Sequence, residues 1–188
     1  MLYPFVRPGL DMLIVGLNPG GTSSQKGHYF SSNSALWNQL YDSGLITRPV
    51  DKNVADDLVF GSSKINANGW EYGITDLVNY YAESDSRKVN PTRENCKDLM
   101  QTILEYKPKV VVLLHGKIIK HFVEGFLGKE DVEYGNLGKL IDGLDTVFFN
   151  VPFPCGNAIT SEAKVELYKQ IKDTLESWDT MIDTHTVR

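Results

Sequence analysis

The stretch Leu13-Ile14-Val15-Gly16-Leu17-Asn18-Pro19-Gly20-Gly21 decides the fold of this chain. Its apolar run breaks abruptly into an asparagine that is followed by turn formers. A short continuous apolar segment bounded by Pro and Gly is typical of a strand buried on both faces, and such strands occur mostly in parallel sheets under helices. We therefore expect Asn18 at the carboxyl end of a strand, where ligands bind in open α/β sheets.

Outward from this stretch, strand-like runs alternate with amphipathic stretches. We expect further strands at 72–78, 110–114 and 146–151, and the segment 127–144 is Gly-rich and irregular. Helical spacing predicts helices between the strands and a last helix that begins near Thr160. The alternation predicts one α/β domain over residues 1–188, with four parallel strands, helices on both faces and a frayed tail at 179–188.

Composition narrows the class of protein. With 188 residues, of which 41% are hydrophobic, the chain can bury one sizeable core. No apolar run approaches the roughly 20 residues of a membrane span, and the N-terminus does not look like a secretory signal. Cys96 and Cys155 form no C-x-x-C pair, so a zinc ribbon or four-cysteine cluster cannot be built within the chain. We expect a soluble, cytoplasmic protein with no membrane partner.

The net charge of the chain restricts how it could bind nucleic acid. The formal net charge of −5 argues against broad, charge-driven coating of nucleic acid. A local basic face remains compatible with this total.

Asn18 is the first candidate for a chemical role. An amide takes no proton near neutral pH, but its carbonyl oxygen can hold a water and its NH2 group can donate. It suits a reaction with a dissociative transition state, in which water needs orienting more than deprotonating. The alternative is an asparagine that caps the turn following it.

Gly20 and Gly21 form a turn in which small residues let backbone N–H groups approach an anion. The chain has neither G-x-G-x-x-G nor G-x-x-x-x-G-K-[ST], so dinucleotide and nucleoside-triphosphate binding lack their fingerprints. A tight strand-exit turn with no ligand is the alternative.

The polar loop at 22–31 carries His28, Tyr29 and Phe30. His28 could donate to a substrate phosphate or carbonyl, or be a solvated or capping residue. An aromatic ring in such a loop can stack on a planar base or fold back onto the core. We expect His115, at the end of the third strand, to be structural.

Several segments together resemble a known family. Gly16-Leu17-Asn18-Pro19-Gly20, then Gly27-His28-Tyr29-Phe30, then Leu36-Trp37 resemble the first motif of the mismatch-specific uracil/thymine-DNA glycosylases, in sequence and in spacing. Gly73-Ile74-Thr75-Asp76-Leu77-Val78 looks like that family's second strand. Val151-Pro152-Phe153-Pro154-Cys155-Gly156-Asn157 occupies the place of its last motif, the loop that enters DNA. The resemblance covers about residues 11–178.

The resemblance implies a three-layer α/β/α sandwich around a central four-stranded parallel sheet, as in uracil-DNA glycosylases. It implies a monomer that excises uracil or a mismatched base from DNA, with no metal or cofactor. Asn18 would orient the water that attacks C1′, and Phe30 would stack on the flipped base. The other base-binding residues would be Leu17, through its backbone, Gly20 and His28. The residues in contact with DNA would be Lys26, Pro154, Cys155, Gly156 and Asn157, the last four filling the gap in the duplex.

The chain also departs from the family. Phe153-Pro154-Cys155 stands where many relatives carry Asn or His followed by Pro-Ser, and Asn157 replaces a large apolar or basic wedge. Cys155 is expected to pack rather than to act as a nucleophile, because no sequence signal suggests an activating base. Two alternative functions remain. One is a non-catalytic nucleic-acid or nucleotide binding module on the same fold, and the other is an α/β enzyme acting on a free nucleoside or another small ligand.

Overall fold

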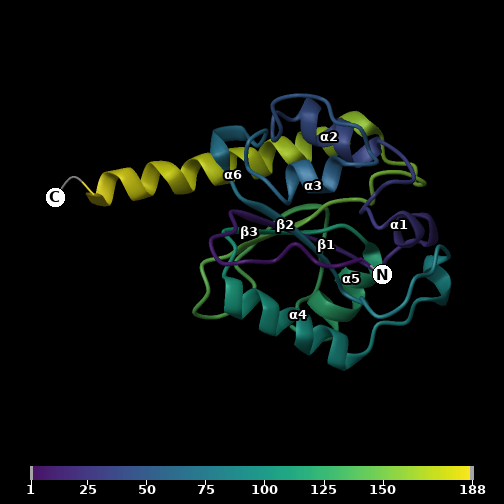
Figure 1. The fold of residues 1–188 in the computed structure, drawn as a ribbon. Coiled ribbons are helices and arrows are strands. Elements are labelled where there is room, and N and C mark those ends of the chain that lie inside the picture. Colours follow the sequence, from purple (N-terminus) through teal and green to yellow (C-terminus); the bar gives the residue numbers. More distant parts are fainter. Residues whose placement is uncertain (1, 187–188) are drawn as a thin grey trace.

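The computed structural model describes the backbone of residues 2–186 and the side chains of residues 2–181. Its centre is a five-stranded sheet with the order β2-β1-β3-β5-β4 (Figure 1). The strands are β1 (Met12–Gly16), β2 (Tyr72–Asp76), β3 (Val110–Leu113), β4 (Gly135–Gly138) and β5 (Val147–Asn150). All of β1 is buried, and it pairs in parallel with β2 on one side and β3 on the other, so the prediction of a buried parallel strand is confirmed.

The sheet contains one strand more than the sequence predicted. β4 runs antiparallel to β5 at the sheet edge, within the segment that we expected to be irregular, so the prediction of four strands is wrong in this detail. Gly135 and Gly138 have positive φ angles, and a register shift interrupts the pairing. Such a segment lacks the apolar alternation of a strand, and its strand character comes from pairing with the backbone of β5.

Helices fill the connections between the strands. They are α1 (Gly21–Lys26), α2 (Ala35–Asp42), α3 (Ala55–Val59), α4 (Arg93–Tyr106), α5 (Gly116–Ile118) and α6 (Ser161–Thr186). Short 3-10 turns lie at Ala67–Gly69 and Ser86–Lys88, and a π-helical turn at Ile119–Glu124 follows α5. Among the described residues, none of these helices combines the length and apolar character needed to cross a bilayer.

The last helix is longer than expected. The sequence predicted fraying from residue 179, but the backbone of α6 remains helical through Thr186. The end of the expected tail, residues 187 and 188, lies outside the described residues. In Figure 1, the C-terminal part of α6 extends well beyond the edge of the sheet.

Two hydrophobic clusters pack the two faces of the sheet. Met12 and Ile14 of β1 join buried residues of α2, α3 and α6, whereas Leu13 and Val15 join those of α4 and α5. Figure 1 shows the first set of helices on one side of the sheet and the second set on the other. Burial of each such side chain contributes about 1.5–3 kcal/mol, so β1 is held from both faces. This fixes the position of the turn that follows it.

Candidate functional site

A cavity of about 580 Å³ opens at the carboxyl ends of the parallel strands. Its walls come from the turn after β1, the aromatic loop before α2, the loop after β2, the end of β3 and the loop after β5. The predicted site residues that line it are Leu17, Asn18, Gly20, Phe30, Pro154, Cys155, Gly156 and Asn157. The structure therefore brings the first and last motifs to a single cavity, because the parallel strands that precede them end at the same edge of the sheet.

Asn18 is fixed at the edge of this cavity by its amide nitrogen. Nδ2 donates to the carbonyl oxygen of Pro19 at 2.9 Å and to that of Glu83 at 2.8 Å. Both partners are acceptors, so the nitrogen must face them and Oδ1 is left as the free acceptor. Within the described part of the chain, no hydrogen bond to Oδ1 is present. The side chain is thus held rigidly while its oxygen remains available to a water.

The glycine turn is tied to the loop after β2. The backbone N–H of Gly21 donates to the Ser84 hydroxyl at 3.0 Å, and the N–H of Glu83 donates to the carbonyl of Pro19 at 3.0 Å. Glu83 and Ser84 also line the cavity. The turn is therefore a tight strand exit braced by a neighbouring loop, and one of its N–H groups is already used within the protein.

The two aromatic residues of the 22–31 loop both line the cavity but differ in burial. Tyr29 is buried and belongs to the cluster under α2 and α3, and burial raises the pKa of its hydroxyl far above the ordinary range. Phe30 packs against the same cluster but is only partly buried. Its φ of 49° is left-handed, and its carbonyl accepts a hydrogen bond from Trp37 Nε1 at 3.2 Å. Phe30 is therefore the more open of the two rings at the cavity.

Two predicted site residues, Lys26 and His28, are not among the residues that line the cavity. The exposed Lys26 donates to Asn53 Oδ1 at 3.0 Å, and His28 Nδ1 lies 2.8 Å from Asp56 Oδ1. The ring of His28 is thus held by the buried carboxylate of Asp56, which is a strong hydrogen-bond partner.

The loop after β5 forms another part of the cavity wall. The carbonyl of Pro154 accepts hydrogen bonds from Gln39 Nε2 at 3.0 Å and from the buried Lys164 Nζ at 3.1 Å. Asn33 Nδ2 donates to Cys155 Sγ at 3.2 Å. These contacts anchor the base of the loop to α2 and α6.

The tip of this loop is held by its own asparagine. Asn157 Nδ2 donates to the carbonyl of Phe153 at 2.8 Å, and its Oδ1 accepts from the N–H of Ile159 at 3.2 Å. Gly156 has a φ of 74°, a conformation that glycine adopts without strain. The Asn157 side chain therefore folds onto its own backbone rather than extending from the loop.

Phe153 adds a second, partly exposed aromatic ring to the cavity. It is 36% exposed, and its ring centroid lies 5.9 Å from that of Phe30 at an interplanar angle of 38°. The ring of His115 lies 6.1 Å away on another side. Rings in direct contact leave no room for a third ring between them, so Phe30 and Phe153 form adjoining walls.

His115 has the structural role that we expected, and it also lines the cavity. Its Nδ1 accepts a hydrogen bond from the N–H of Lys117 at 3.0 Å and so caps α5. Burial, with the nearby Lys117 charge, lowers the pKa of the imidazole. The ring is therefore neutral at pH 7 and carries its proton on Nε2.

Asp76, at the end of β2, is a site residue that our reading of the sequence missed. It lines the cavity, is fully buried, and its Oδ2 has no hydrogen-bond partner in the described part of the chain. Burial raises the pKa of this carboxyl to about 7, because a charge is costly in an apolar surrounding. A Cβ on Gly16 would lie 2.3 Å from Asp76 Oδ1, so only glycine fits beside it.

One signal in the sequence could have pointed to Asp76. It is an acidic residue that ends a strand-like run, as Asn18 follows one. The parallel register pairs Gly16 with Asp76, which places the two strand ends side by side. Parallel strands that end together gather polar groups at one edge, so a strand-ending aspartate is a candidate for the same site.

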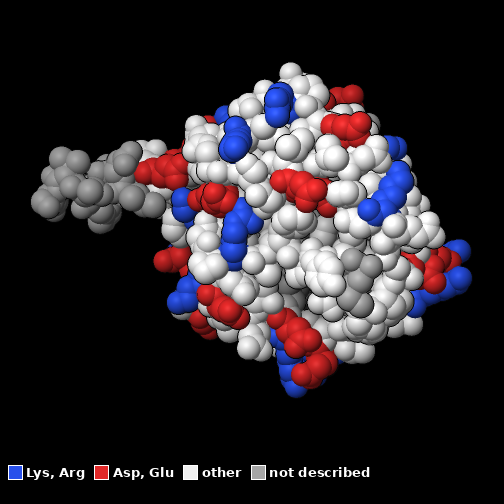
Figure 2. Space-filling model, in the orientation of Figure 1, with Lys and Arg blue, Asp and Glu red and all other residues white. Residues whose placement is uncertain are grey.

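Fixed positive charge is not part of the cavity wall. The charged residues among those that line it are acidic, Asp76 and Glu83. Ser86 and Gly116 line the cavity and are followed directly by Arg87 and Lys117. On the face shown in Figure 2, acidic and basic side chains are interspersed, with no large area of either sign. Contacts to phosphates must therefore come from single cations near the cavity.

The described residues include one group of side chains close enough together to hold a metal ion, formed by His28, Asp56 and Asp57. Asp56 Oδ2 already accepts from the N–H of Tyr29 at 2.8 Å, and its Oδ1 accepts from the N–H of Asp57 at 3.0 Å. These hydrogen bonds satisfy the buried carboxylate without an ion, so the group is part of the loop structure.

The fold and the cavity define an α/β protein with a ligand site at the carboxyl edge of a mostly parallel sheet. Its polar groups are a fixed carboxamide and a buried carboxyl, and its apolar walls are aromatic. Residues 3–172 match the model of the uracil DNA glycosylase superfamily. The match covers most of the 188 residues, and the chain belongs to this superfamily. Membership indicates a DNA glycosylase, a hydrolase of DNA repair that acts on a DNA substrate.

Proposed function

We propose that this protein hydrolyses the N-glycosidic bond of uracil, or of a related damaged or mispaired base, in DNA. The observation that carries the proposal is the geometry of Asn18, whose nitrogen is fixed by two carbonyls while its oxygen stays available at the cavity. The resemblance of the first motif to the mismatch-specific uracil/thymine-DNA glycosylases supports this choice within the superfamily. The enzyme is proposed to be monofunctional, monomeric and cytoplasmic, and to need no cofactor.

In the proposed mechanism, the bond between base and sugar lengthens until the sugar resembles an oxocarbenium ion. Asn18 Oδ1 accepts a hydrogen bond from a water and aims it at C1′. The amide does not remove the proton, so the step depends on the leaving ability of the base. General-base assistance is typically worth about 10²- to 10⁴-fold, so without it the enzyme is slow and favours good leaving groups such as uracil.

The base must leave the duplex before it can enter the cavity. Extrusion of a nucleotide costs about a few kcal/mol and is cheapest at a mispair, which favours mismatched substrates. Phe30 provides the face on which the extruded base stacks, and the Leu17 backbone and Gly20 lie beside it. In this proposal the loop from Pro154 to Asn157 would contact the duplex at the gap, and the exposed Lys26 would contact a phosphate outside the cavity.

Asp76 gives the proposed site a pH-dependent group. With a pKa of about 7, its carboxyl is protonated in slightly acidic solution and presents both an O–H donor and a carbonyl acceptor. The ionised form would repel the anionic base as it leaves, so we expect the protonated form to be the active one.

The test is base release from a panel of duplex oligonucleotides that carry uracil, thymine, hypoxanthine or an alkylated base opposite guanine. We expect free uracil from the G·U duplex and its loss in Asn18→Ala. No release from any member of the panel would overturn the proposal. DNA binding that Asn18→Ala leaves unchanged, without release, would instead indicate a binding module. Turnover of free deoxyuridine without DNA would indicate an enzyme for small ligands.

A further inference from the structure

The segment 51–57 lies outside the cavity but is joined to the loop that carries Phe30. Lys26 Nζ donates to Asn53 Oδ1 at 3.0 Å, and Lys52 Nζ donates to the carbonyl of Ser32 at 3.0 Å. Asp56, at the start of α3, contacts the His28 ring and the N–H of Tyr29, which lie between Lys26 and Ser32 in the sequence. The contacts therefore reach the loop on both sides of Phe30.

Asp56 makes the buried contacts of this set. The residue is 1% exposed, and its Oδ2 accepts from the N–H of Tyr29 at 2.8 Å. Its Oδ1 lies 2.8 Å from His28 Nδ1 and 3.0 Å from the N–H of Asp57. A buried carboxylate is tolerated only when such donors compensate for lost water, so Asp56 and the loop depend on each other.

Phe30 needs such support because of its backbone. Its φ of 49° belongs to the left-handed region, which is strained for a residue other than glycine. Trp37 Nε1 holds the carbonyl of Phe30 at 3.2 Å, and Asp56 holds the N–H of the preceding residue. The strained residue is therefore fixed by a hydrogen bond on each side.

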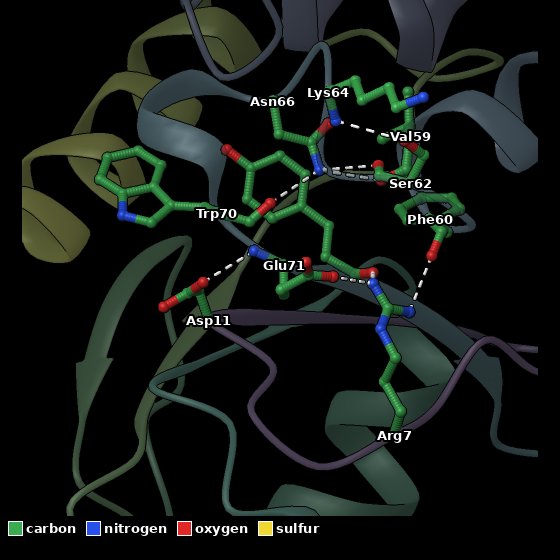
Figure 3. Close-up of polar contacts among 10 residues, drawn as sticks. Arg7, Asp11, Val59, Phe60, Ser62, Lys64, Asn66, Trp70 and Glu71 are labelled. Atoms are coloured by element: carbon green, nitrogen blue, oxygen red, sulfur yellow. Dashed lines mark hydrogen bonds and ion pairs between the residues drawn. The ribbon is translucent and has the colours of Figure 1, made fainter.

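α3 is itself fixed to the sheet, as Figure 3 shows. Arg7 NH1 donates to the carbonyl of Phe60 at 2.7 Å, directly after α3, and Arg7 NH2 reaches the carbonyl of Tyr72 in β2 at 3.3 Å. The buried Asn66 donates through Nδ2 to the carbonyl of Val59 at 3.0 Å, at the last residue of α3. The C-terminal end of the helix is thus anchored while its first turn presents Asp56 to the loop.

We propose that Asp56 is a positioning residue for Phe30, the ring on which the extruded base stacks. It acts through the N–H of Tyr29 and through His28, and it touches neither the substrate nor the cavity. The inference rests on the proposed function only for the role of Phe30. The fixed geometry of the loop is a property of the free protein, so it can be tested without DNA.

The first test is amide hydrogen exchange of the free protein. The N–H of Tyr29 should be protected in the wild type and should exchange at least about tenfold faster in Asp56→Ala, as expected for one lost hydrogen bond. Asp56→Asn keeps an acceptor for Tyr29 and should retain most of the protection. Asp57→Asn, a change on the neighbouring exposed residue, is the matched control and should leave Tyr29 unchanged. A Tyr29 amide that is unprotected in the wild type overturns the proposal, whether or not Asp56→Ala folds.

The second test is a double-mutant cycle with Phe30→Ala, read as KM and kcat for base release. If Asp56 acts through Phe30, Asp56→Ala should raise KM as Phe30→Ala does, and the double variant should be no worse than Phe30→Ala within about twofold. If the effects of the two substitutions were additive in the double variant, the positioning role of Asp56 would be overturned. General destabilisation would then explain the effect of Asp56→Ala. An enzyme inactive on every substrate would refute the proposed function, while hydrogen exchange would still decide the role of Asp56.

Discussion

Asn18 and Asn157 line one cavity from two different loops and use their amide nitrogens in the same way. Asn18 Nδ2 donates to the carbonyls of Pro19 and Glu83, and Asn157 Nδ2 donates to those of Phe153 and Cys155. The difference is at the oxygen. Asn157 Oδ1 accepts from the N–H of Ile159, whereas Asn18 Oδ1 has no protein partner among the described residues. The side chain of Asn157 thus stabilises its own loop, whereas Asn18 has an oxygen that is available to bind a water.

The comparison assigns different roles to the two walls. The wall after β1 and β2 holds the polar groups that can act on the reaction, Asn18 and Asp76. The wall after β5 contributes the apolar ring of Phe153 and backbone groups. Changes on the first wall should therefore affect the rate of base release, and changes on the second should affect substrate binding.

The largest effect is expected from Asn18→Ala. The variant loses the acceptor that aims the water, and we expect kcat for uracil release to fall by about 10²-fold, because positioning of the water is lost. Binding of a G·U duplex, measured by titration, should change little because the ring of Phe30 remains. A kcat within threefold of the wild type would remove Asn18 from the proposed mechanism.

Asp76→Asn should change the pH dependence more than the maximum rate. In the wild type, the rate should fall about tenfold for each pH unit above the carboxyl pKa of about 7, because the active form is protonated. Asparagine stays neutral, so its rate should remain flat from pH 6 to 9. Equal pH profiles for the two proteins would show that Asp76 does not control the reaction.

The same substitution should affect stability with a definite sign. The folded-state pKa of Asp76 is raised above that of the unfolded chain, so the folded state binds more protons and loses stability as pH rises from about 4 to 7. Asp76→Asn removes this loss. Its melting temperature relative to the wild type should be higher at pH 8 than at pH 5, as thermal unfolding would show.

A smaller effect is expected from Phe153→Ala. The variant loses the ring contact with Phe30, and such pairs contribute about 0.5–1.5 kcal/mol. We expect KM for the duplex to rise about two- to tenfold with kcat nearly unchanged, which is the signature of lost uniform binding. A large fall in kcat with KM unchanged would show that Phe153 affects the rate of base release rather than substrate binding.

The smallest effect is expected from Asn157→Ala, because that side chain bonds only to its own exposed loop. Steady-state kinetics should show changes of less than about threefold in kcat and KM, as for most exposed substitutions. If Asn157→Ala were as damaging as Asn18→Ala, the distinction between the two asparagines would be wrong.

Local patterns predicted much of the fold but little of the side-chain placement. The four parallel strands follow from buried apolar runs that end in turn formers. β4 could not be predicted, because a glycine-rich segment becomes a strand only when a partner strand lies beside it. The different burial of Tyr29 and Phe30 could not be predicted either, since it depends on contacts with residues distant in sequence, such as Asp56, which lies 26 residues beyond Phe30.

The sequence by itself determined the buried strand at Met12–Gly16 and the polar break at Asn18, because apolar periodicity and turn formers act over a few residues. It also determined that the first and last motifs meet, since parallel strands end at one edge. Only the tertiary structure decided that the oxygen of Asn18 stays available, that burial raises the pKa of the Asp76 carboxyl to about 7, and that His28 turns to Asp56. Hydrogen-bond partners and burial are supplied by residues distant in sequence, and these set the chemistry of each side chain.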